Sequence, residues 1–152
     1  MQTKKLYSLV ILLVIIMVVG YVYASKKEKT VVEIKTENVI YDNATSDLIT
    51  VELPFPGAVT GKEFSVIGKA RGNWFFEASF PVTVFDKDGN VLVETYASAE
   101  GEWMTTHFVP FKAEIKAPIS YIGPATVVLY KNKPTDMREL DAKISFPFTI
   151  EY

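Results

Sequence analysis

The chain contains one histidine, His107, and imidazole is the side chain that most often transfers protons near neutral pH. A serine hydrolase would need a nucleophile held beside it, yet the sequence has no Gly-x-Ser-x-Gly elbow. Cysteine is absent, which excludes thiolate nucleophiles, disulfides and Cys-ligated zinc or iron–sulfur sites. We therefore predict that His107 is a surface or rim residue and assign no catalytic residue.

Carboxylates offer two further kinds of chemistry. Asp86, Asp88 and Asn90 have the spacing of the start of a calcium loop, but the distal glutamate of an EF-hand is missing, and a tight hairpin turn explains them better. Glu77 and Glu102 are the alternative: a cell-wall glycosidase would need both in one cleft, about 5–10 Å apart. The prediction is no metal, no cofactor and no enzymatic activity, with the carboxylate enzyme as the alternative.

Aromatic and basic side chains complete the candidates. Trp74 and Trp103 could line a groove for carbohydrate or peptide, because aromatic residues are enriched at binding surfaces. The structural interpretation, in which they fill the core or its ends, is favoured. Arg71 and Glu77 are expected to form a structural ion pair rather than a catalytic acid. Net charge is −2 and no basic stripe is present, which argues against nucleic-acid binding.

The elements that must position these residues are predicted to be strands. The stretch 71–89 alternates apolar and polar residues from Trp74 to Phe85 and closes in Asp86-Lys87-Asp88-Gly89, as expected for the first arm of a β-hairpin. Six similar runs accompany it: 48–53, 64–70, 91–96, 108–116, 125–130 and 143–152. Seven strands separated by turn signals favour an all-β, immunoglobulin-like antiparallel β-sandwich.

Three prolines lie inside these runs. A proline cannot donate to a strand ladder, so Pro81, Pro110 and Pro147 are each expected at an edge, at a bulge or where a strand changes sheets. We expect at least one bulge near Pro81.

The N-terminal part has a different character. Residues 6–24 are almost wholly apolar, follow Lys4 and Lys5, and just reach the length that crosses a bilayer. We predict a short cytoplasmic N-terminus (1–5), a single transmembrane signal anchor (6–24), a polar linker (25–47) and an extracytoplasmic domain (48–152). The alternative is a signal peptide cleaved after Ala24. Within the linker, the alternations at 32–34 and 39–41 leave room for an added edge strand.

Several stretches of the domain are similar to one known family. They are Pro54–Val59, Val66–Gly72, Trp74–Val82, Asp86–Leu92, Trp103-Met104 and Phe108–Phe111. Together they resemble the bacterial spore-germination immunoglobulin-like domain over roughly residues 48–152. The chain differs after the Pro-Gly turn, where Thr60-Gly61-Lys62-Glu63 replaces the Ser-Pro step that the family tends to have.

The resemblance implies a bacterial, extracytoplasmic sandwich without established catalytic residues. We therefore expect a non-catalytic binding or scaffolding module, held at the cell membrane through residues 6–24. Its expected partner is another envelope protein or a cell-wall polymer. A purely structural spacer is the other alternative, and it predicts neither a pocket nor an exposed apolar patch.

Overall fold

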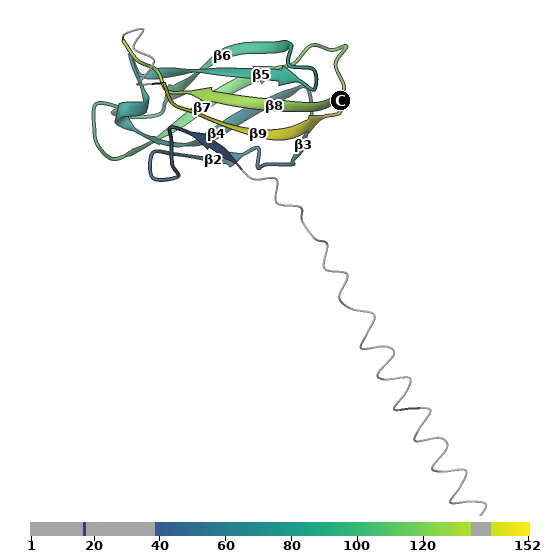
Figure 1. The fold of residues 1–152 in the computed structure, drawn as a ribbon, viewed down its shortest axis with the longest axis horizontal. Coiled ribbons are helices and arrows are strands. Elements are labelled where there is room, and N and C mark those ends of the chain that lie inside the picture. Colours follow the sequence, from purple (N-terminus) through teal and green to yellow (C-terminus); the bar gives the residue numbers. More distant parts are fainter. Residues whose placement is uncertain (1–16, 18–38, 135–140) are drawn as a thin grey trace, which may run out of the picture. The chain divides into compact units, whose positions relative to one another are not determined.

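The computed structural model of the protein describes residues 39–134 and 141–152, together with Met17 (Figure 1). The predicted anchor, apart from Met17, and the linker as far as residue 38 lie outside this part. Within it, no helix is long and apolar enough to cross a membrane. One short 3-10 helix, η1 (Gly72–Trp74), accompanies the strands β1 (Ile40–Asp42), β2 (Ile49–Leu53), β3 (Val59–Thr60), β4 (Glu63–Arg71), β5 (Ser79–Asp86), β6 (Val91–Ala99), β7 (Phe108–Lys116), β8 (Gly123–Tyr130) and β9 (Lys143–Ile150).

The strands pair in the order β1-β9-β8-β5-β6-β7-β4-β2, and every pair on this path is antiparallel. β6 joins the two layers because it pairs with β5 along most of its length and with β7 through Ser98 and Ala99. On the other side, β2 pairs with β4, whereas β3, a few residues later, pairs in parallel with β9. The predicted all-β, immunoglobulin-like sandwich is confirmed.

The core lies between the layers, where alternate side chains of facing strands meet. β7 shows the expected period of two, with Val109, Phe111, Ala113 and Ile115 buried between exposed neighbours. In β9 alternate side chains are also buried: Ile144, Phe146, Phe148 and Ile150. One end of the core is aromatic. Its rings are in contact as Trp74–Phe80, Phe75–Phe80 and Phe80–Phe111, with centroids 6.4, 5.2 and 4.9 Å apart.

The prediction of one strand from Trp74 to Phe85 is wrong at its beginning, because β5 begins only at Ser79. The preceding residues form a tight turn in which Phe76 and Ser79 exchange backbone hydrogen bonds of 3.0 and 3.2 Å. Glu77 and Ala78 connect them with φ of +53° and +59°, which is the left-handed region. Trp74 ends η1, so this part of the chain packs both Trp74 and its neighbour Phe75 into the core.

This turn predicts an unusual stabilising substitution. Ala78→Gly is expected to raise the free energy of unfolding by about 0.5 kcal/mol, because glycine adopts positive φ without the cost that a Cβ brings. Ala99→Gly, in β6, is the control of opposite sign and should cost about 1 kcal/mol, since glycine weakens a strand. Urea unfolding followed by circular dichroism measures the free energy of unfolding of both variants. An equal loss of stability in Ala78→Gly and Ala99→Gly would contradict the left-handed turn.

The prolines only partly follow the expectation. The irregularity in β5 lies between Val84 and Phe85, so the bulge predicted near Pro81 is displaced toward the end of the strand. Pro81 instead lies just beyond Val82, where the ladder between β5 and β8 ends, so its missing N–H removes no bond from that ladder. Pro147 lies on β9 between the segments paired with β1 and with β3, which is an edge position as predicted.

Residues 40–42, within the predicted linker, form β1 on the outer side of β9. The alternation at 39–41 therefore supplies the edge strand that the sequence left as an option. The alternation at 32–34 lies outside the described residues.

Candidate functional site

The strand directions give the sandwich two distinct ends. The first, which we call the cavity end, carries residues 43–48, 72–78, 100–107, 131–134 and 141–142. The second, the C-terminal end, carries residues 54–62, 87–90, 117–122 and the C-terminus, which Figure 1 marks. Backbone hydrogen bonds hold the segments of the second end together, including Lys62 N to Tyr152 O at 2.5 Å and Ala117 N to Lys62 O at 2.8 Å.

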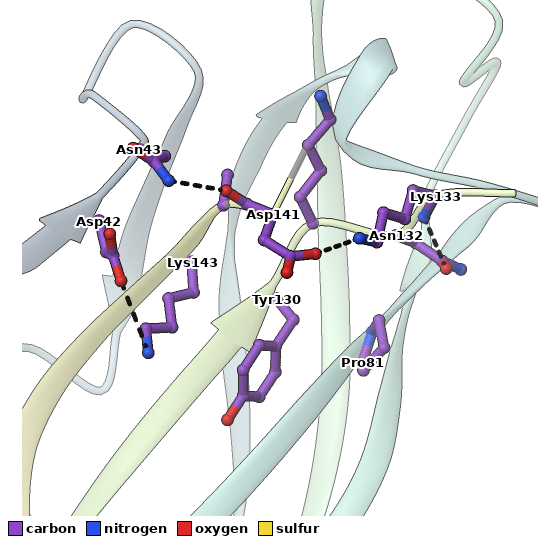
Figure 2. A pocket seen from close by; sticks show the side chains of 10 residues that line it. Asp42, Asn43, Pro81, Tyr130, Asn132, Lys133, Asp141 and Lys143 are labelled. Atoms are coloured by element: carbon purple, nitrogen blue, oxygen red, sulfur yellow. Dashed lines mark hydrogen bonds and ion pairs between the residues drawn. The ribbon is translucent and has the colours of Figure 1, made fainter. Parts of the chain in front are cut away.

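A polar cavity of about 460 Å³ opens at the cavity end (Figure 2). It is lined by ten residues: Asp42, Asn43, Pro81, Tyr130, Lys131, Asn132, Lys133, Asp141, Ala142 and Lys143. They come from β1, from the start of β5 and from the two ends of the connection between β8 and β9. The cavity exists because β1 pairs with β9 and brings Asp42 opposite Lys143.

Oppositely charged groups face each other around this cavity. Lys133 Nζ pairs with the Asp141 carboxylate, and Lys143 Nζ lies 3.5 Å from Asp42 Oδ2. Asn43 Nδ2 donates to the carbonyl oxygen of Asp141 at 3.2 Å, a bond drawn in Figure 2. Pairs this exposed contribute little stability, about 0–1 kcal/mol each. Their chemical consequence is a lining that presents ammonium donors, carboxylate acceptors and an amide beside the ring of Tyr130.

Asn132 connects the cavity to the aromatic core. Its side-chain Nδ2 donates to the carbonyl oxygens of Phe76 and Ser79, at 3.2 and 3.1 Å, and so holds both ends of the left-handed turn. Its backbone N–H donates to the carbonyl oxygen of Trp74 at 3.0 Å. The cavity is therefore built on a fixed backbone rather than on an isolated loop, which favours a preformed binding site.

The two predicted aromatic positions have structural surroundings. Trp74 is 0% exposed and belongs to the core, so it cannot contact a ligand at the surface. Trp103 is half-buried and packs against the core. Neither lines the cavity. Trp74 thus fills the core, and Trp103 covers part of its surface.

The candidate carboxylates and the histidine lie elsewhere at the cavity end. Glu77 and Glu102 are exposed, neither lines the cavity, and Glu102 Oε1 accepts the N–H of Met104 at 3.1 Å. His107 is exposed, as predicted, and its backbone N–H donates to Thr105 Oγ1. The carboxylate pair of the alternative enzyme hypothesis is therefore not part of the cavity.

Arg71 has partners other than the expected Glu77. Its Nε donates to the carbonyl oxygen of Asp47 and its Nη1 to that of Thr106, both at 3.0 Å. Its guanidinium lies 4.2 Å from the centre of the Phe108 ring. Arg71 thus ties together two loops and a strand by hydrogen bonds and a cation–π contact.

The turn at 86–90 is a hairpin, as predicted. Asp86 Oδ1 accepts the backbone N–H groups of Asp88 and Asn90 at 2.8 Å each, and Oδ2 accepts Asn90 Nδ2 at 2.9 Å. The hydrogen bonds from Asn90 hold the pKa of the Asp86 carboxyl below its ordinary value. Among the described residues, no group of three or more His, Asp or Glu side chains is arranged to hold a metal ion.

The sequence signals missed the cavity residues. Asp42 and Asn43 lie in the stretch predicted as a linker, and Lys131, Asn132, Lys133, Asp141 and Ala142 lie between two predicted strands, where no motif marks them. Pro81, Tyr130 and Lys143 lie in predicted strands, with nothing to indicate a shared cavity. Only the short alternation at 39–41 hinted at β1. Comparison with known proteins bears on the fold instead. Searches of the curated proteins and of the solved structures give no match. Residues 48–138 match the sequence profile of the immunoglobulin-like domain of bacterial spore germination. This match covers more than half of the chain, and it agrees with the sandwich described above. The chain therefore belongs to the family of the immunoglobulin-like domain of bacterial spore germination.

Proposed function

We propose that the protein is a non-catalytic binding module of the bacterial cell envelope, which residues 6–24 anchor in the cell membrane with the sandwich outside. The family supports a binding or structural role for the domain. The apolar run and the basic pair before it support the anchor. The partner is another envelope protein or a cell-wall polymer.

The observation that carries this proposal is the polar cavity at the cavity end. Two of its lysines, Lys133 and Lys143, are paired with Asp141 and Asp42, and these charged groups offer directional donors and acceptors. Tyr130 and Pro81 add apolar surface beside these groups, and this mixture is typical of ligand sites. A purely structural spacer would not need such a cavity.

Photocrosslinking in intact cells tests the proposal. With p-benzoylphenylalanine in place of Tyr130, which lines the cavity, illumination is expected to yield a discrete adduct of the full chain. The same group in place of Tyr96, which is exposed on β6 opposite Pro81 but is not among the residues that line the cavity, is the matched control. Sensitivity of the adduct to protease or to a muramidase distinguishes a protein partner from a wall polymer.

A charge reversal sharpens the test. Lys143→Glu places two carboxylates opposite each other at the cavity, because Lys143 pairs with Asp42, and it should reduce the adduct at position 130 several-fold. Equal labelling from positions 130 and 96, insensitive to Lys143→Glu, would show that the cavity binds nothing specific.

A further inference from the structure

Exposed apolar side chains gather at the C-terminal end. Ten large apolar side chains are exposed in residues 39–134 and 141–152, and seven of them belong to this end or to the strand ends next to it. The seven are Leu53, Phe55, Val59, Val91, Ile119, Ile122 and Tyr152. The cavity end has only Met104 among the ten, while Ile40 and Tyr96 lie on strands. Single exposed apolar residues are ordinary, but such a concentration at one end marks an interaction surface.

Four separate segments form this surface: the β2–β3 connection, the β5–β6 turn with the start of β6, the β7–β8 loop and the C-terminus. Strand pairing brings them together, since Glu63 lies opposite Lys116, Asp86 opposite Ala125, and Gly123 opposite Ile150. At one side the surface contains a groove of about 370 Å³ that Leu53, Phe55 and Val59 help to line. The apolar residues therefore lie in loops and at strand ends of several elements, not along one strand edge.

The chain enters the sandwich from this same end. β1 is antiparallel to β9, with Ile40 opposite Ser145 and Asp42 opposite Lys143. β1 therefore runs from the C-terminal end toward the cavity end. Ser145, the partner of Ile40, lies five residues before the end of β9, or about 17 Å along that strand. The fifteen residues 25–39, which precede it, span at most about 50 Å when extended.

We propose that the C-terminal end of the sandwich rests on the phospholipid bilayer, with the side chains of Phe55, Ile119 and Ile122 in its interfacial layer. The inference rests on the proposed anchor at residues 6–24. Phenylalanine and isoleucine gain free energy on leaving water, and tyrosines such as Tyr121 and Tyr152 are favoured at the headgroup level. The occupant is a lipid surface because the direction of β1 and the short tether keep this end within reach of the membrane.

Tethering makes a weak contact sufficient. An anchored domain meets the bilayer at an effective concentration set by the linker, on the order of millimolar, so a few inserted side chains can hold it there. The cavity end, at the opposite end of the strands, then faces away from the membrane. The domain would present the cavity of Figure 2 outward at a fixed height above the lipid.

The absence of cysteine permits a direct test on the full chain. Ile119→Cys carries an acrylodan label at the C-terminal end, where Ile119 is 89% exposed, and Met104→Cys carries it at the cavity end, where Met104 is 74% exposed. In vesicles of phosphatidylethanolamine and phosphatidylglycerol, we expect a blue-shifted emission and quenching by doxyl-labelled lipid at position 119 only. Phe55→Asp with Ile122→Asp should reverse both effects at position 119.

Two results would overturn the inference. Equal emission and equal lipid quenching at positions 119 and 104 would show that the two ends do not differ. A blue shift at position 119 that lipid does not quench, and that falls as protein is diluted, would show contact with a second copy. Cleavage of the proposed anchor would be detected separately, because the intact mass of the protein purified from cells would then match a chain that begins at Ser25.

Discussion

Replacing Trp74 by alanine is expected to lower the free energy of unfolding by about 3–5 kcal/mol, because the substitution removes the largest fully buried side chain described in the domain. Its ring packs edge-to-face on Phe80, which also contacts Phe75 and Phe111. The cavity left behind cannot close easily, since η1 and the left-handed turn hold the backbone on either side. Against a typical stability of about 5–15 kcal/mol, such a loss endangers folding.

Trp74→Phe separates the contribution of the packed ring from that of the indole N–H. The indole Nε1 is buried and has no hydrogen-bond partner among the described residues, so phenylalanine removes an unpaired donor while keeping a ring in the core. The expected loss is about 1–2 kcal/mol, well below that of alanine. Urea unfolding of the full chain in detergent micelles, followed by far-ultraviolet circular dichroism, measures both variants.

Tyr96→Ala provides the surface control and should change stability by no more than about 0.5 kcal/mol, because Tyr96 is 62% exposed on β6. A Trp74→Ala variant as stable as this control would contradict the aromatic core. A Trp74→Phe variant as damaged as Trp74→Ala would show instead that the indole N–H is satisfied.

Most strands could be predicted because each has one face in the core and one in water. The segment 108–116 is the clearest case: its predicted limits are those of β7, and its alternation is that of the buried side chains. The segment 74–78 misled for a physical reason. Its aromatic residues continue the alternation of β5, yet Trp74 and Phe75 are adjacent and both buried, which a strand with a single core face cannot achieve.

The candidate cavity could not be predicted because its residues meet only through long-range pairing. Asn43 bonds to Asp141, 98 positions along the chain, and this contact depends on β1 joining the outer side of β9. A three-residue strand leaves almost no periodic signal. Asn132 was equally hidden, since a polar residue in a loop gives no sign that it bonds to Phe76 and Ser79.

Gly72 is visible in the sequence, within a stretch that resembles the family, but the sequence does not reveal why glycine is needed there. A Cβ on Gly72 would overlap the carbonyl oxygens of Trp103 and Thr105 and lie 2.9 Å from the carbonyl carbon of Thr105. These are backbone atoms, which cannot rotate aside as a flexible side chain can. Gly72 is therefore required by the close passage of the 103–105 segment over η1.

Gly72→Ala is accordingly expected to destabilise the domain by about 3 kcal/mol, because the 103–105 segment must shift to admit a single methyl group. Gly101→Ala is the matched control. The same methyl group at Gly101 meets nothing within 4 Å, so that variant should lie within about 0.5 kcal/mol of the wild type. Both glycines belong to segments at the cavity end, but only Gly72 has this close approach to neighbouring backbone.

A second measurement locates the effect of Gly72→Ala. Displacing the 103–105 segment should also disturb the bond from Arg71 Nη1 to the carbonyl oxygen of Thr106, so backbone amides near Thr106 are expected to exchange faster with deuterium. Amides of β8 and β9, on the other layer, should keep their protection relative to global unfolding. Equal stabilities of Gly72→Ala and Gly101→Ala would contradict the close approach. A large loss without local exchange near Thr106 would place the strain elsewhere in η1.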